Sequence, residues 1–140
     1  MGVEATRFMH AGELVPDGVI LGIIGEALQH DDSEEGFLLD GFPRTEAQAE
    51  GLQTLLADKG LAIDAIVNLV VDDAEIGKRL STRGRKDDTV DTIGRRIEVY
   101  QAETRPVLEW YGNHGVRIVS VEGVGDIESI QAHILERLGL

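Results

Sequence analysis

The sequence predicts an α/β fold in which a short parallel sheet of about three strands is flanked by helices. Three apolar runs suit buried strands, and they alternate with longer segments whose apolar residues recur at helical spacing. Alternating strands and helices imply right-handed crossovers and therefore a parallel sheet. The chain has 140 residues, which is enough for a single domain with a real core.

The first thirty residues are predicted to be mainly helical. Residues 3–11 have the composition of the end of a helix, although their amphipathic pattern is weak. Residues 12–17 form a turn, with Pro16 near the start of the next helix, which extends to about Gln29. The apolar positions of that helix keep a 3.6-residue period; they are Val19, Ile20, Ile23, Ile24 and Leu28.

Residues 36–39 are the first predicted strand, because they contain the apolar run Phe37 to Leu39. Thr45 is the expected cap of the following helix, since its hydroxyl can accept a hydrogen bond from a free backbone N–H. This helix extends to about Lys59 and ends at Gly60. Its inward positions are Ala49, Leu52, Leu55 and Leu56.

The second half of the chain repeats this alternation. Residues 63–71 form a second strand, apolar enough to be covered on both faces. A helix from Asp72 to about Gly84 and a charged loop, 85–89, come next. A long helix then runs from about Thr89 to Gly112, and its internal Pro106 should kink it.

Residues 116–121 are the third predicted strand, and a last helix follows the turn Gly123–Gly125. The inward positions expected for that helix are Ile127, Ile130, Ile134 and Leu138.

Composition narrows the classes of function. The net charge is −13, with 26 acidic and 13 basic residues, so long-range electrostatics oppose binding to nucleic acid or anionic membranes. No apolar run is long enough to span a bilayer, and the N-terminus lacks the pattern of a signal peptide. Cysteine is absent, which excludes disulfides and thiolate metal sites and is compatible with a cytoplasmic location.

Asp40 and Arg44 follow the first predicted strand at its carboxyl end. Open α/β sheets place ligands at this edge, and a guanidinium there can bind phosphate or carboxylate through two donors. The alternative is a purely structural turn, because any strand–turn–helix connection needs a glycine, a proline and a cap.

A basic cluster lies between residues 78 and 96, and it consists of Lys78, Arg79, Arg83, Arg85, Lys86, Arg95 and Arg96. Two helices joined by a short loop can direct these side chains at one volume. Phosphoryl transfer requires such preorganised donors, because charge spreads over several oxygens in its transition state. The alternative is a solvated face of salt bridges to neighbouring acids.

The motif Asp40-Gly41-Phe42-Pro43-Arg44-Thr45 resembles the signature of adenylate kinases and related nucleoside monophosphate kinases. The segment 79–89 is similar to the lid of a short-lid bacterial adenylate kinase. The resemblance covers nearly the whole chain and implies a truncated three-layer α/β/α fold of the P-loop-kinase type. By this resemblance, residues 1–30 are the remainder of the AMP-binding subdomain, residues 79–96 are the lid and the rest is the core.

The resemblance also implies roles for individual residues on the AMP side. Backbone groups of Glu13, Leu14 and Val15 would hold the base, and Gln48 would read the adenine edge. Arg44, with Gly41 beside it, would contact the AMP phosphate. As alternatives, Gln48 is a surface residue and the turn around Leu14 is only a helix cap.

On the ATP side, the resemblance assigns Arg79 and Arg83 to the phosphates and the carbonyl of Gly125 to the adenine. Arg85 and Arg96 would bridge the donor and acceptor phosphates. Two acids, Asp87 and Asp88, would help close the lid. Asp40 would hold Mg²⁺ through water, with no direct protein ligand to the metal.

Adenylate kinases begin with a strand, a glycine-rich phosphate-binding loop with its lysine, and a helix, none of which is found here. The motif G-x-x-x-x-G-K-[ST] does not occur in the sequence. The expected function is therefore Mg²⁺-dependent conversion of ATP and AMP to two ADP, with impaired or residual activity. The alternatives are a non-catalytic nucleotide-binding fragment and a fragment made to study folding.

The same departure from the family affects the predicted sheet. Without the family's first strand, the strand at 36–39 and the strand at 63–71 would each keep an unpaired edge. The sheet could close up in the order Phe37, Ala65, Val116, or two chains could associate through their open edges. We expect association into a homodimer, because exposed strand edges and apolar faces are both adhesive.

Overall fold

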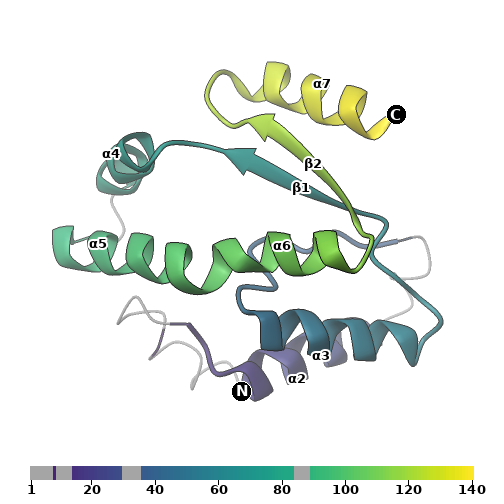
Figure 1. The fold of residues 1–140 in the computed structure, drawn as a ribbon. Coiled ribbons are helices and arrows are strands. Elements are labelled where there is room, and N and C mark those ends of the chain that lie inside the picture. Colours follow the sequence, from purple (N-terminus) through teal and green to yellow (C-terminus); the bar gives the residue numbers. More distant parts are fainter. Residues whose placement is uncertain (1–7, 9–13, 30–35, 84–88) are drawn as a thin grey trace.

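The computed structural model describes residue 8 and residues 14–29, 36–83 and 89–140 (Figure 1). The elements in chain order are α2 (Asp17–Ala27), α3 (Glu46–Ala57), β1 (Ala65–Val70), α4 (Asp73–Arg83), α5 (Val90–Val99), the π-helical turn η2 (Tyr100–Thr104), α6 (Arg105–Asn113), β2 (Arg117–Glu122) and α7 (Ile127–Leu138). The predicted helix at 3–11, apart from residue 8, and most of the predicted charged loop lie outside the described residues.

The sheet of the described residues consists of β1 and β2, which are parallel. Its register runs from Ala65 opposite Arg117 to Val70 opposite Glu122. Helix α7 packs on one side of β2 and α6 packs on the other, so the sheet lies between helices (Figure 1). The α/β class, with a short parallel sheet flanked by helices, is confirmed.

The first of the three predicted strands, residues 36–39, is not formed, so that prediction is wrong. This segment carries no strand assignment, and β1 and β2 make the whole of the described sheet. Phe37 and Leu39 instead pack against an apolar cluster between α2 and α3. The segment is therefore held by its side chains, and the closed-up order with residue 37 beside β1 is not formed. Association of two chains stays a prediction.

Helix α3 is the centre of the apolar core. Its buried apolar residues lie three and four positions apart, and they belong to two clusters. Leu52 and Leu56 pack with Leu28, which follows α2, and Ala49 packs with Val107 and Tyr111 of α6. Helix α3 thus joins α2 to the layer that covers the sheet, as Figure 1 shows.

A π-helical turn lies close to Pro106, where the sequence predicts a kink. Helical structure continues from Val90 to Asn113, and η2 ends two residues before Pro106. Arg105 donates its backbone N–H to the carbonyl of Tyr100, five residues earlier. A wider turn suits this position because proline has no N–H and its ring crowds the carbonyl of the preceding turn.

The last helix is only partly oriented as predicted. Ile130, Ile134 and Leu138 are half-buried, but Ile127 is 83% exposed because it is the first residue of α7. In the parts of the chain that the structure describes, none of the helices combines the length and apolar character needed to cross a bilayer.

Candidate functional site

The turn after residue 39 folds the Arg44 side chain back over its own backbone. Arg44 Nε donates a hydrogen bond of 2.6 Å to the carbonyl oxygen of Gly41. Gly41 has φ +70°, and a Cβ at this position would lie 2.9 Å from Arg44 Nη2. Glycine therefore meets two needs of the turn, a left-handed backbone and room for the guanidinium.

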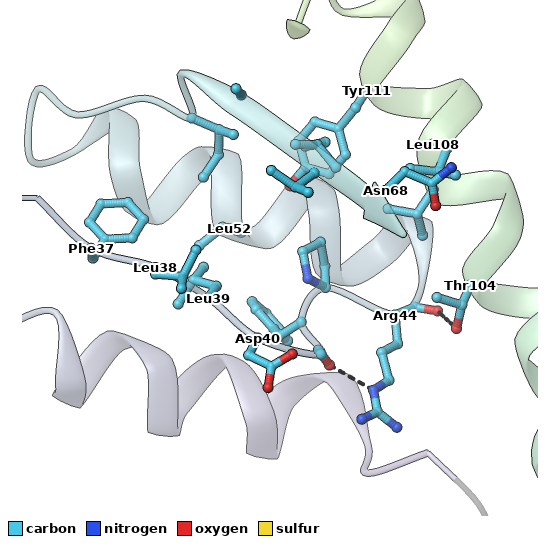
Figure 2. Close-up of a pocket in the computed structure, with 18 of the residues that line it drawn as sticks. Phe37, Leu38, Leu39, Asp40, Arg44, Leu52, Asn68, Thr104, Leu108 and Tyr111 are labelled. Carbon is cyan, nitrogen blue, oxygen red and sulfur yellow. Dashed lines mark hydrogen bonds between the residues drawn. The ribbon is translucent and has the colours of Figure 1, made fainter. Parts of the chain in front are cut away.

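The backbone of Arg44 is held on both sides. Its N–H donates to Gln48 Oε1 at 2.7 Å, and its carbonyl accepts from the hydroxyl of Thr104 at 3.0 Å. Figure 2 shows the Thr104 bond, which links the turn to η2, together with the bond inside the turn. These contacts fix the backbone of Arg44, from which the exposed guanidinium extends. They leave the Nη atoms of the guanidinium available to a ligand.

Gln48 is 2% exposed, and its side chain is part of a network that includes Asp17. Gln48 Nε2 donates to Asp17 Oδ1 at 2.9 Å, and the Thr45 hydroxyl donates to the same oxygen at 3.1 Å. Thr45 also accepts from the N–H of Gln48 at 3.1 Å, which is the predicted helix cap. Sequence reasoning missed Asp17, whose only signal was its place at the start of a helix.

A large open cavity of about 1200 Å³ lies beside this turn. It brings together residues from separate elements: Asp40, Gly41 and Arg44 of the turn, Arg83 of α4 and Arg96 of α5. Leu14, from the predicted base-binding turn, also lines it. Four arginines, Arg44, Arg83, Arg96 and Arg117, thus line the same cavity as the two acids Asp40 and Asp64.

The other predicted site residues either do not line this cavity or lie outside the described part of the chain. Val15, Gln48, Arg79 and Gly125 are not among the described residues that line the cavity. Gly125 lies in the turn before α7, with φ +136°. Four predicted residues lie outside the described part of the chain; they are Glu13, Arg85, Asp87 and Asp88.

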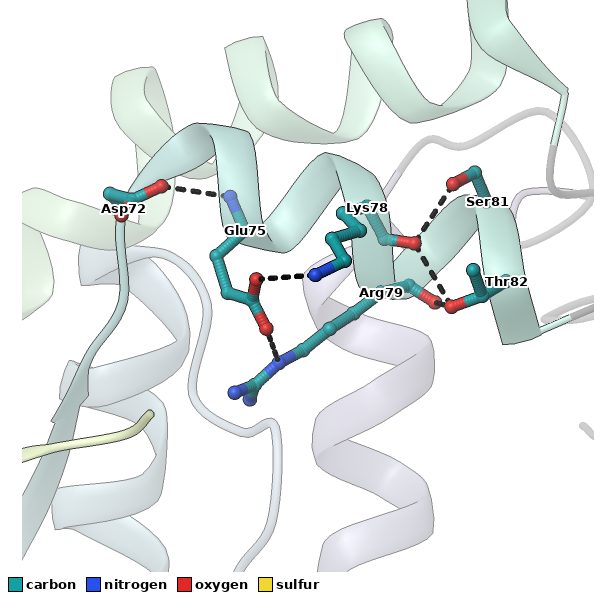
Figure 3. A network of polar contacts seen from close by, with 6 residues as sticks. All are labelled: Asp72, Glu75, Lys78, Arg79, Ser81 and Thr82. Carbon is teal, nitrogen blue, oxygen red and sulfur yellow. Dashed lines mark hydrogen bonds and ion pairs between the residues drawn. The ribbon is translucent and has the colours of Figure 1, made fainter. Parts of the chain in front are cut away.

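The first part of the basic cluster forms local ion pairs. Arg79 Nε lies 2.7 Å from Glu75 Oε1, and Lys78 Nζ lies 3.9 Å from Glu75 Oε2 (Figure 3). Arg95 pairs with Glu98 at 3.6 Å in the same way. These residues match the alternative of a solvated, salt-bridged face, whereas Arg83 and Arg96 line the cavity.

The donor set for a metal is small. The described residues contain no group of three or more His, Asp and Glu side chains arranged around a metal ion. Asp40 is an exposed carboxylate on the cavity wall beside Arg44. A single carboxylate fits Mg²⁺ that keeps most of its water and takes its other ligands from a phosphate chain.

Tyr111 is a further polar residue of the cavity lining, and it also belongs to the apolar core. Its side chain is 4% exposed and packs edge-on against Trp110. Its hydroxyl is buried and has no hydrogen-bond partner among the described residues. Burial raises the pKa of Tyr111 to about 12 from its ordinary value of 10.0.

Comparison with known proteins agrees with this fold and with the two motifs. A family model described as adenylate kinase matches residues 1–116. The chain is 42% identical over 139 residues to an adenylate kinase of Corynebacterium aurimucosum, covering 99% of this chain and 75% of the relative. An adenylate kinase of Leptospira biflexa is 42% identical over 142 residues, covering 99% and 76%.

A further relative, an adenylate kinase of Rhodococcus erythropolis, is 40% identical over 139 residues. With this coverage and identity, the chain belongs to the adenylate kinase family. It spans about three-quarters of the length of the relatives that it matches.

Proposed function

We propose that this chain binds adenine nucleotides in the cavity beside Arg44 and transfers a phosphoryl group from ATP to AMP, giving two ADP. The transferred phosphorus would leave the β–γ bridging oxygen of ATP and bond to a phosphate oxygen of AMP. The observation that carries the proposal is that Arg44, Arg83 and Arg96, from three separate elements, line one cavity. The chain has a net charge of −13, whereas the cavity lining has four arginines and two aspartates, so the cavity is locally more basic than the chain as a whole.

Within this proposal, Arg44 binds the AMP phosphate, and its hydrogen bond to Gly41 preorganises the guanidinium. Arg83 and Arg96 stabilise the charge that spreads over the phosphate oxygens during transfer. Arg79 is paired with Glu75, so it contributes to the ATP phosphates only if that ion pair rearranges. Asp40 would hold Mg²⁺ through water, and the bound ion would neutralise phosphate charge.

Gln48 needs a revised role in this proposal. Its amide is buried and bonded to Arg44 and Asp17, so contact with an adenine would require exchange of the Asp17 bond. The present contacts support Gln48 as a positioning residue that fixes Arg44. Leu14, on the cavity wall, remains the proposed contact to the base among the described residues of the 13–15 turn.

Turnover is proposed to be impaired or residual, and a non-catalytic nucleotide-binding role is the alternative. The observation that favours the alternative is the absence of the motif G-x-x-x-x-G-K-[ST] from the 140 residues. Backbone amides of that loop and its lysine normally hold the transferred group. The remaining arginines would have to position the phosphates as well as stabilise charge.

The test is ADP formation from ATP and AMP by the purified chain, with Mg²⁺ present. Arg44→Ala, purified in parallel, reports on contaminating kinase, because a contaminant would be unaffected by the substitution. ADP formation that the variant abolishes supports catalysis. Nucleotide-induced NMR shifts at residues 40–44 without turnover would support the binding role. If neither ADP formation nor NMR shifts are observed, both the catalytic role and the binding role are contradicted.

A further inference from the structure

One hydrogen bond between side chains joins the start of α4 to the π-helical turn η2. Gln101 Nε2 donates to Asp73 Oδ2 at 2.7 Å, although the two residues are 28 positions apart. Asp73 is the first residue of α4, and the residue before it caps the helix, since Asp72 Oδ1 accepts from the N–H of Glu75 at 2.8 Å (Figure 3). The carboxylate of Asp73 is therefore not needed for the cap, and it binds a distant part of the chain instead.

The two elements that this bond joins lead to two of the arginines of the cavity. Arg83 is the last residue of α4, and Arg96 lies in α5, which continues directly into η2. Both arginines line the cavity. Gln101 thus connects the helix that carries one guanidinium to the helix that carries the other.

Helix α4 stands at the end of β1, and among the described elements it packs mainly against α5 (Figure 1). Only Val71 and Asp72 connect it to β1. Each of these residues has two soft backbone dihedrals, so the link fixes the start of α4 more firmly than its direction. Contacts along the side of the helix must therefore set its tilt, and the bond to Gln101 is such a contact in the first turn.

The tilt of α4 decides where the guanidinium of Arg83 lies. Arg83 is ten residues beyond Asp73, so it begins about 15 Å further along the helix. A tilt of about 10° at the start of α4 would shift this end by about 2–3 Å. A donor placed about 3 Å from a phosphate oxygen loses its hydrogen bond after such a shift. The separation of Arg83 from Arg96 is thus sensitive to contacts at the opposite end of α4.

The turn that carries Arg44 is held by other contacts. Its backbone bonds to the side chains of Gln48 and Thr104, and neither of these bonds involves α4. Gln101 itself is exposed and is not among the described residues that line the cavity. Loss of the Gln101 bond should therefore displace Arg83 and leave Arg44 in place.

We propose that Gln101 is a positioning residue for the polyphosphate of the donor nucleotide: through Asp73 it sets the tilt of α4, and hence the separation of Arg83 from Arg96. This inference rests on the proposed nucleotide function and adds to it a residue that does not touch the substrate. A polyphosphate has oxygens on several phosphorus atoms, so it binds both guanidiniums at once only when their separation matches the chain. A monophosphate bound at Arg44 does not depend on that separation.

The first test compares the affinities for ATP and AMP by calorimetric titration. Gln101→Ala should raise the Kd for ATP about three- to tenfold, the effect of one lost hydrogen bond. The Kd for AMP should stay within about twofold of wild type. Gln131→Ala removes the same type of side chain from an exposed position of α7, so it is the matched control and should change neither value.

A swapped pair tests whether the bond itself matters. Gln101→Glu places a second carboxylate against Asp73, so it should raise the Kd for ATP at least as much as Gln101→Ala. Adding Asp73→Asn to this variant exchanges donor and acceptor and restores the total charge of the chain. The Kd for ATP should then return to within about twofold of wild type. A residue that acts only through its charge or through general stability would not give this recovery.

The tilt of α4 can also be measured without a nucleotide. Residual dipolar couplings of backbone N–H groups report the direction of each helix. Those of α4 should change relative to those of α5 and α6 in Gln101→Ala, and they should recover in the swapped pair. This measurement tests Gln101 even if the wild-type chain binds no ATP, so failure of the nucleotide proposal remains distinguishable from failure of this one.

Equal ATP affinity in Gln101→Ala and Gln131→Ala would overturn the proposal. So would an equal loss of ATP and AMP affinity in Gln101→Ala, because the effect would then not be specific to the polyphosphate. A Kd for ATP that does not recover in the swapped pair, or α4 dipolar couplings that do not change in Gln101→Ala, would overturn it as well.

Discussion

The side-chain amide of Gln48 accepts a hydrogen bond of 2.7 Å from the backbone N–H of Arg44, four residues earlier. The same amide donates to Asp17 at 2.9 Å, so a buried side chain ties the start of α2 to the turn that carries the arginine. The position of the guanidinium at the cavity thus depends on a residue of the α3 core face. This arrangement leads to predictions for both residues.

Arg44→Ala should weaken AMP binding by ten- to a hundredfold, which corresponds to loss of a charge-assisted hydrogen bond worth about 1.5–3 kcal/mol. Calorimetric titration with AMP measures the change. Arg105→Ala is the matched control, because Arg105 is exposed on α6 and is absent from the described cavity lining. Equal AMP affinity in wild type and Arg44→Ala would exclude Arg44 from the acceptor site.

Gln48→Ala should lower the free energy of unfolding by about 1–3 kcal/mol, because the Arg44 N–H and Asp17 both lose a partner. Urea denaturation measures this loss. Gln53→Ala, an exposed position on the same helix, should change the stability by less than about 0.5 kcal/mol. If both variants unfold at the same urea concentration, the network does not stabilise the turn.

ATP and ADP binding should weaken as salt is raised from low to physiological concentration, since partly exposed arginines are screened. The structure also predicts which arginine substitution should weaken ATP binding more. Arg83→Ala should weaken ATP binding more than Arg79→Ala, because Arg83 lines the cavity and Arg79 is not among the described residues that line it. If the affinity for ATP or ADP does not change with ionic strength, or if Arg79→Ala has the larger effect, the basic cluster does not bind phosphates in the proposed way.

Tyr111→Phe should make the stability of the free chain less sensitive to alkaline pH. In the folded chain the pKa of Tyr111 is raised to about 12, whereas the unfolded value is near 10.0. The stabilisation is fully present below pH 10 and is lost as the pH rises towards 12, because the unfolded chain releases its proton first. Urea denaturation at pH 8, 10 and 11 should show that the free energy of unfolding declines less with pH in Tyr111→Phe than in wild type.

At neutral pH the same variant should be as stable as wild type or more stable, by up to about 1 kcal/mol, because the buried hydroxyl has no partner in the described structure. Tyr100→Phe, at a residue that is 42% exposed, is the control. A marked loss of stability in Tyr111→Phe alone would mean that the hydroxyl is bonded in solution.

The sequence by itself determined the α/β class, most of the helices and the Thr45 cap of α3. These features rest on local signals. Thr45 caps α3 and Thr89 caps α5 through bonds to residues three positions away. Helical spacing likewise identified Leu52 and Leu56 as core residues.

Only the tertiary structure decided which strands pair and which polar groups find partners. The run at 36–39 has strand-like composition, but a strand needs a neighbouring edge, and these residues pack on helices instead. Gln48 bonds to Asp17, 31 residues away, and the carbonyl of Arg44 bonds to Thr104, 60 residues away. The physical reason is that both ladders and polar networks depend on which distant segments are brought together, and local patterns do not contain that information.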